Sequence, residues 1–205
     1  TRGVGARTDY LVNGKGDCLL FLTAAKRDQR EGRPFCAHTA DGGATWQLRS
    51  WIGSEPETGF VIMPASVRLP DGGIIVALRV QPDRTRASIQ AYRSDDEGYT
   101  WLPLPDPVPS LAPSNPPAIV RLLDGRLCLT FGVRAAPYRI CARFSPDDGL
   151  TWGDELTLRA DGANGDLGYT RTVQRTDGTI VTVYYFNDSM TGVERYIAAT
   201  LWRAP

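Results

Sequence analysis

The sequence predicts an all-β protein made of about four repeated blades, each with four antiparallel strands, because two motifs recur in phase along it. In the first motif an acidic residue is followed at fixed spacing by glycine, threonine and tryptophan, and its copies are Thr39–Trp46, Ser94–Trp101 and Ser145–Trp152. The second motif is an Asp-Gly turn, whose copies place Asp71, Asp124 and Asp177 53 residues apart. We call these the Thr-Trp turns and the Asp-Gly turns. Two motifs that share one period are typical of stacked units the size of a propeller blade.

The second repeat shows the strands of one blade most clearly. Alternating residues over 65–69 predict a first strand. The turn at 70–73 leads to an apolar, β-branched run over 74–78, which is typical of a strand buried on both faces. Residues 87–92 predict a third strand, and a short fourth strand follows Trp101. No segment shows convincing helical periodicity.

The same order of strands is expected in the other repeats. The third repeat has candidate strands at 118–122, 126–131 and 139–144, and the fourth has them from 169, at 180–186 and at 196–202. The first repeat is irregular at its opening turn, 14–17, and otherwise complete. We therefore expect a single propeller domain over 1–205, with repeats at about 7–53, 60–106, 114–160 and 168–202.

The Thr-Trp turns also carry a resemblance to a known family. Two copies match Ser-x-Asp-x-Gly-x-Thr-Trp at every defined position, and Thr39 replaces serine in the other. This pattern resembles the Asp-box, or bacterial neuraminidase repeat, of six-bladed sialidase-like propellers, and the last repeat is similar to the last blade of sialidases. The motif has a structural explanation, since its carboxylate can bind turn amides and its tryptophan can pack between blades. It therefore predicts the fold and leaves the chemistry open.

The resemblance and the composition set the expected context. Four blades do not close a six-bladed ring, so we expect further blades outside these 205 residues. The chain has 23 basic and 23 acidic residues with scattered arginines, which argues against a nucleic-acid partner. It has no run of apolar residues long enough to span a membrane. The family resemblance implies a secreted or periplasmic protein, and the oligomeric state stays open.

The metal-binding and thiol residues are few. His38 is the single histidine, and alone it cannot build a usual zinc site or a Ser-His-Asp triad, so no cofactor is expected. Cys18 and Cys36, and likewise Cys128 and Cys141, fall on neighbouring strands where cross-strand disulfides are conceivable. Buried free thiols are commoner and are the expectation here.

Strand alternation locates a candidate site on one rim of the propeller. The Thr-Trp and Asp-Gly turns share one rim, here called the turn rim. The opposite rim, here called the start rim, receives the beginning of each first strand and the loop between the second and third strands. Arginines, a tyrosine and carboxylates converge there. They suit an anionic sugar because guanidinium groups bind carboxylates through paired, charge-assisted hydrogen bonds.

The resemblance to sialidases implies roles for particular residues. Tyr169 resembles the nucleophilic tyrosine, which these enzymes use because the substrate carboxylate would repel a carboxylate nucleophile. Glu57 is the candidate for the carboxylate that takes the phenol proton, with Glu55 as a less favoured neighbour, and Asp9 is the candidate general acid/base. The candidate substrate-binding arginines are Arg79, Arg139, Arg134, Arg171 and Arg7. The chain lacks a Phe/Tyr-Arg-Ile-Pro motif, so the family's first arginine is expected outside it.

Three functions remain open on the sequence. The first is an exo-acting glycoside hydrolase of sialidase type, releasing terminal sialic acid or a related acidic sugar from glycoconjugates. The second is a non-catalytic propeller that binds a glycan or a protein on the same rim. The third is a sialidase-like polysaccharide lyase, in which Tyr169 would act as acid/base instead of nucleophile.

Overall fold

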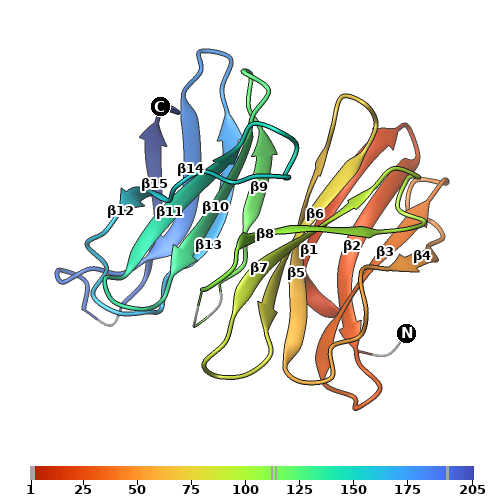
Figure 1. Ribbon diagram of the computed structural model, residues 1–205, viewed down its shortest axis with the longest axis horizontal. Coiled ribbons are helices and arrows are strands. Elements are labelled where there is room, and N and C mark those ends of the chain that lie inside the picture. Colours follow the sequence, from red (N-terminus) through yellow and green to blue (C-terminus); the bar gives the residue numbers. More distant parts are fainter. Residues whose placement is uncertain (1–2, 112, 114, 193) are drawn as a thin grey trace.

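The computed structural model describes residues 3–111, 113, 115–192 and 194–205, with the backbone but not the side chains of residues 6 and 7. Within this range the chain forms four antiparallel sheets and no helix, which confirms the predicted all-β propeller class (Figure 1). It follows that the described part contains no helix able to cross a membrane.

Each sheet is one blade, with its strands paired in chain order. Blade 1 contains β1 (Gly5–Gly14), β2 (Asp17–Ala25), β3 (Glu31–Thr39) and β4 (Gln47–Trp51). Blade 2 contains β5 (Phe60–Arg68), β6 (Ile74–Gln81), β7 (Ser88–Ser94) and β8 (Leu102–Val108). Blade 3 contains β9 (Ala118–Arg121), β10 (Leu127–Val133), β11 (Arg139–Ser145) and β12 (Leu156–Arg159). Blade 4 contains β13 (Gly168–Gln174), β14 (Ile180–Phe186) and β15 (Tyr196–Trp202).

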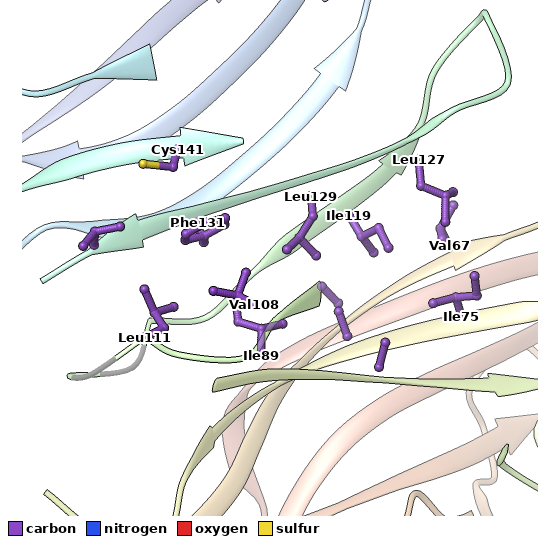
Figure 2. Packing of buried hydrophobic residues seen from close by; sticks show 14 of the residues in the cluster. Val67, Ile75, Ile89, Val108, Leu111, Ile119, Leu127, Leu129, Phe131 and Cys141 are labelled. Carbon is purple, nitrogen blue, oxygen red and sulfur yellow. The ribbon is translucent and has the colours of Figure 1, made fainter. Parts of the chain in front are cut away.

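The blades pack side by side, and their first strands β1, β5, β9 and β13 contact one another in that order toward the middle of Figure 1. Side chains from facing blades fill the space between them. Figure 2 shows this for blades 2 and 3, where Val67 and Ile75 meet Leu127 and Leu129. Residues 74–78 of β6 are fully buried, as the unbroken apolar run predicts, because this strand has a blade against each face.

The Thr-Trp turns repeat one set of hydrogen bonds. In the third copy Ser145 Oγ accepts the Gly149 N–H at 2.8 Å, and Asp147 accepts both the N–H and the hydroxyl of Thr151, at 2.8 and 2.6 Å. The second copy has the same bonds at the same distances, and in the first copy the Thr39 hydroxyl replaces that of serine. The carboxylates are thus used inside their own turns.

The tryptophans of these turns pack against the preceding blade where the structure describes one. Trp101 meets Phe21 of blade 1 edge-on, with ring centroids 6.1 Å apart, and Trp152 packs on the core between blades 2 and 3. Trp46, in blade 1, is 44% exposed.

All four cysteines are free, which confirms the expectation of thiols. Cross-strand register explains it, because Cys36 lies opposite Phe21 and Cys141 opposite Phe131, so neither faces another cysteine. Burial raises the pKa of Cys36, Cys128 and Cys141 to about 12, and these thiols therefore stay protonated at neutral pH.

Candidate functional site

Two strand residues on the start rim have a left-handed backbone, which non-glycine residues rarely adopt. They are Met63 in β5, with φ 57°, and Tyr169 in β13, with φ 55°. In each case a buried polar side chain of the preceding blade accepts the N–H: Thr23 Oγ1 for Met63 and Asn115 Oδ1 for Tyr169, both at 3.2 Å. The strands are irregular in register at these points, so both side chains leave the normal alternation of the sheet.

Tyr169 lies among groups from blades 3 and 4. The ring of Tyr185 meets its ring edge-on, with centroids 5.5 Å apart, and the Arg134 guanidinium lies 5.6 Å from the ring centroid. Tyr185 Oη accepts a hydrogen bond from Arg134 Nη2 at 2.6 Å and donates one to Asp166 Oδ1 at 2.8 Å. Tyr169 itself is 37% exposed and so is accessible from outside.

Arg79 brings blade 2 into the same place. It lies near the end of β6, interacts with the side chain of Tyr169, and donates to Met63 Sδ at 3.7 Å. Burial lowers the pKa of Arg79, and the charge of Arg134 lowers it further, while the phenols of Tyr169 and Tyr185 act in the opposite direction. We call Arg79, Arg134, Asp166, Tyr169 and Tyr185 the start-rim cluster.

The cluster is suited to bind an anion. Burial and the hydrogen bond to Asp166 raise the pKa of Tyr185 to about 12, while the pKa of Asp166 is lowered, chiefly by that same hydrogen bond. Asp166 also forms an ion pair with Arg195. At neutral pH the two arginines of the cluster and the neighbouring Arg195 therefore face a single ionised carboxylate, that of Asp166, which leaves the site positively charged.

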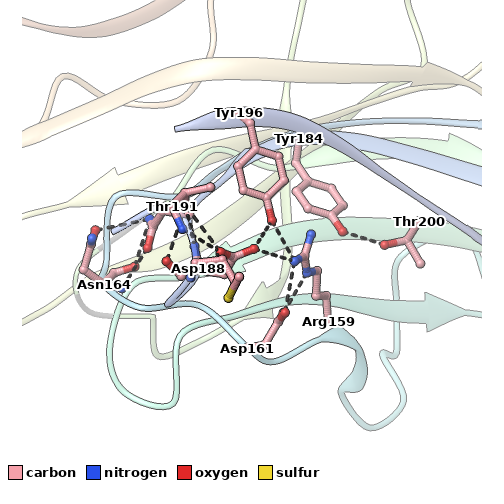
Figure 3. A network of polar contacts seen from close by, with 10 residues as sticks. Arg159, Asp161, Asn164, Tyr184, Asp188, Thr191, Tyr196 and Thr200 are labelled. Atoms are coloured by element: carbon pink, nitrogen blue, oxygen red, sulfur yellow. Dashed lines mark hydrogen bonds and ion pairs between the residues drawn. The ribbon is translucent and has the colours of Figure 1, made fainter. Parts of the chain in front are cut away.

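A polar network holds the loop that carries Asp166. Asn187, fully buried, donates to Asn164 Oδ1 at 3.2 Å and to the Asp166 carbonyl at 2.8 Å. Beside it, Arg159 binds Tyr196 Oη at 2.8 Å, and Tyr196 donates to Asp188 (Figure 3). These contacts tie the segment between β12 and β13 to blade 4 and so fix Asp166 beneath Tyr185.

Asp9 and Arg171 lie together, on the inner strands. Their ion pair is 3.4 Å long and joins β1 to β13. Asp9 Oδ2 also accepts hydrogen bonds from the N–H and the hydroxyl of Ser66 in β5. The side chain of Arg7, another candidate, lies outside the described residues.

Two further candidates lie away from Tyr169. Arg139 forms an ion pair with Glu155 at 2.8 Å on blade 3. Glu57 is exposed in the loop between β4 and β5 and lines a pocket of about 310 Å³. Its link to the cluster is indirect, through Phe60, which lines the same pocket and lies 5.2 Å beneath the Arg79 guanidinium. A role for either residue in substrate binding or catalysis stays a prediction.

Sequence reasoning assigned no role to Tyr185, Asp166 or Asn115. Tyr185 reads as one of many residues in an alternating strand, and Asp166 as part of a Gly/Asn-rich loop. Asn115 precedes two prolines, a pattern that indicates a rigid start to a strand and assigns no role to the amide. Their partners lie up to 54 residues away, so no local pattern reveals the contacts.

A larger cavity of about 570 Å³ lies on the turn rim and is lined by charged residues that include His38. These side chains bind one another: Arg68 pairs with Glu97 at 2.7 Å, and a hydrogen bond of 3.2 Å joins His38 Nε2 and Asp17 Oδ2. We therefore place the candidate site at the start rim. Across the described residues, no group of three His, Cys, Asp or Glu side chains could hold a metal ion.

Solved structures share this architecture. A Dyadobacter fermentans protein of unknown function is 26% identical, with a TM-score of 0.76 over 94% of this chain and 51% of its own. The GH93 α-L-arabinofuranosidase of Fusarium graminearum is 16% identical, with a TM-score of 0.73 over 97% and 62%. The Hadza microbial sialidase Hz136 is also 16% identical, with a TM-score of 0.65 over 98% and 43%. The chain thus spans about half the length of the first of these proteins.

No curated protein sequence matches the chain. The likeness to these structures shows that the chain shares their propeller fold. At the level of sequence, the model of the BNR repeat-like domain matches residues 11–182, which is well over half of the chain. The chain therefore belongs to the family of BNR repeat-like domains.

Proposed function

We propose that the protein acts on a glycan that carries an acidic sugar, as an exo-acting glycosidase of sialidase type. The observation that carries this proposal is that Tyr169 lies beside both Arg134 and Arg79 at the start rim, with its side chain interacting with that of Arg79. The two arginines supply the charge to hold a carboxylate beside the phenol, and the exposed phenol is available to react.

The proposed reaction proceeds in two steps. In the first step Glu57, whose exposed loop must approach the cluster, takes the proton of the Tyr169 phenol, and the phenol oxygen attacks the anomeric carbon while the glycosidic C–O bond breaks. Asp9 gives a proton to the departing oxygen. In the second step Asp9 takes a proton from the water that attacks the anomeric carbon, the bond to Tyr169 breaks, and the phenol oxygen recovers its proton from Glu57. Arg79 and Arg134 favour the loss of the phenol proton in the first step, because they stabilise the negative charge that develops on the phenol oxygen. Arg139, Arg171 and Arg7 are proposed as further contacts to the glycan.

The similar structures support a carbohydrate as the substrate class. The named enzymes among them are a sialidase and an α-L-arabinofuranosidase, and both act on sugars. Arabinose is neutral and needs no arginine clamp, whereas the positive start-rim cluster favours a sugar with a carboxylate.

The first experiment is hydrolysis of a fluorogenic aryl glycoside of sialic acid by the purified protein and by its Tyr169→Phe variant. We expect turnover by the wild type and none by the variant, with the stability of the variant within about 1 kcal/mol. Tyr99→Phe, on the exposed turn rim, is the matched control and should keep full activity. Turnover that survives in Tyr169→Phe would exclude the phenol as nucleophile.

Two other outcomes would select the remaining functions. An unsaturated uronate, detected by its ultraviolet absorbance after incubation with a uronate polysaccharide, would identify a lyase with Tyr169 as acid/base. Calorimetric binding of the acidic sugar without turnover of either substrate would identify a non-catalytic binding propeller.

A further inference from the structure

Asn115 lies at the start of blade 3 and is fully buried. Pro116 and Pro117 follow it and restrict its backbone to extended conformations, so its side chain has a fixed direction. Its side-chain amide reaches into blade 4, where both the nitrogen and the oxygen form hydrogen bonds. Nδ2 donates to the Leu167 carbonyl at 2.9 Å, and Oδ1 accepts the Tyr169 N–H at 3.2 Å.

The surrounding backbone leaves a slot for this amide. A methyl group at Gly168 would come within 2.7 Å of Asn115 Cγ, and one at Gly132 within 3.0 Å of Nδ2. Both positions therefore need glycine to let the amide pass between β10 and β13. The Asn115 amide therefore packs directly against both glycines, and its two hydrogen bonds bracket Gly168.

The same contacts reach two members of the start-rim cluster. The Leu167 carbonyl that accepts from Asn115 also accepts from Arg134 Nε, at 3.2 Å. The Tyr169 N–H belongs to a residue with φ 55°, a conformation that a tyrosine keeps only when its surroundings hold it there. Asn115 thus controls the position of the phenol directly and that of the Arg134 guanidinium through one shared carbonyl.

We propose that Asn115 is a positioning residue, which holds Tyr169 in its left-handed conformation and so keeps the phenol against Tyr185 and beside the two arginines. This inference rests on the proposed function in taking Tyr169 as the reacting group. Blade 2 supports it by comparison, because there, among the described residues, the Thr23 hydroxyl makes the equivalent of the bond to Tyr169 alone, by accepting the Met63 N–H. The amide of Asn115 adds a donor, and with it the link to Arg134.

The test uses three variants. Asn115→Ala removes both hydrogen bonds, while Asn115→Asp keeps the acceptor for the Tyr169 N–H and removes the donor. Ser145→Ala is the matched control, since Ser145 is an equally buried polar residue of blade 3 that makes its hydrogen bonds on the turn rim. Urea denaturation should show that Asn115→Ala and Ser145→Ala both fold and lose stability to a similar extent.

The deciding measurement is the nuclear Overhauser contact between the rings of Tyr169 and Tyr185, with the Tyr169 signals assigned through Tyr169→Phe. We expect it to be lost in Asn115→Ala and kept in Asn115→Asp and Ser145→Ala. With a turned-over substrate, kcat should fall roughly 10²-fold in Asn115→Ala and recover in part in Asn115→Asp, because a small misplacement of a reacting group costs about that much.

Three results would overturn the proposal: a ring contact that survives in Asn115→Ala, one that is lost in Asn115→Asp as well, or one that is lost in all variants including Ser145→Ala. The last would mean that any loosening of blade 3 suffices. The ring contact is measured without substrate. An inactive wild-type protein would therefore refute the proposed function and leave this test intact.

Discussion

The two rims of the propeller are built from the same strands and follow opposite rules. On the turn rim the glycine N–H donates to the hydroxyl in three blades, at 2.9, 2.8 and 2.8 Å. The threonine N–H donates to the aspartate at the same three distances. On the start rim the left-handed position holds methionine in blade 2 and tyrosine in blade 4. Repetition identifies the framework, and the differences between blades identify the candidate site.

The rims also differ in the reach of their hydrogen bonds. In a Thr-Trp turn the hydroxyl and the aspartate bind groups no more than four residues away. The start-rim cluster depends on contacts between blades, such as Arg134 to Tyr185, which are 51 residues apart. The site can therefore exist only when neighbouring blades have packed, whereas the turns need only their own hairpin.

The largest expected effect tests the framework side of this comparison. Trp152→Ala should reduce the free energy of unfolding by about 3 kcal/mol, because the ring fills space between blades 2 and 3. Trp46→Ala, in an exposed copy of the same turn, should cost less than about 1 kcal/mol. Urea denaturation of both variants measures this, and equal losses would show that the turn itself, and not the packing between blades, needs the tryptophan.

The next effect tests the site side. Arg79→Met should weaken binding of a sialic or uronic acid between about tenfold and a hundredfold, the loss expected for a charge-assisted hydrogen bond of about 1.5–3 kcal/mol. Arg121→Met removes an arginine that pairs with Asp148 on the turn rim, and affinity should stay unchanged. Isothermal titration calorimetry of both variants compares the rims directly, and a loss in Arg121→Met alone would move the site to the turn rim.

Each rim contributes to the dependence of stability on pH, and the Thr-Trp turns contribute to the loss of stability in acid. Hydrogen bonds from Thr45 lower the pKa of Asp41 from 3.8 to about 2. Their stabilising effect is therefore complete above pH 4 and is lost as the pH falls toward 2, because the unfolded state takes up the proton first. Asp41→Asn should reduce this loss in urea midpoints measured from pH 5 to 2, and an unchanged slope would assign it to other carboxylates.

The smallest expected effect is a loss of stability at alkaline pH that comes from Tyr185 on the start rim. The pKa of Tyr185 is raised to about 12, so the folded protein keeps the phenol proton longer than the unfolded chain does. Stability from this group is present below pH 10 and declines as the pH rises from 10 toward 12. Tyr185→Phe should remove that decline in thermal midpoints. Tyr99→Phe, on the turn rim, should preserve it.

Local patterns were sufficient for the fold and for part of the candidate site. The Asp-Gly turns at Asp71, Asp124 and Asp177 predict hairpins because the preference for such a turn depends on local sequence. Their regular spacing then predicts the number of blades. The predicted order of the strands was enough to assign Tyr169 and Arg79 to the same rim, and in the structure their side chains interact there. Whether they bind substrate stays a prediction.

The rest depends on contacts between blades, which leave no local trace. Arg139 has the residue type and the rim for a substrate ligand, yet Glu155 lies close enough to pair with it. The value of Asn115 depends on Leu167 and Tyr169 of the next blade. The two prolines after it predict the conformation of its backbone, but they do not predict which groups its amide will bind.

The ion pair between Asp9 and Arg171 has a consequence for the order in which the chain folds. Strand pairings within a blade join residues of one repeat, whereas this pair closes a loop of 162 residues. Closure of a long loop costs conformational entropy, and an ion pair with an exposed arginine contributes at most about 1 kcal/mol. The pair is too weak to draw the first and last blades together. It is a late contact in folding, and its formation reports that β1, β5, β9 and β13 have already curved around a common axis.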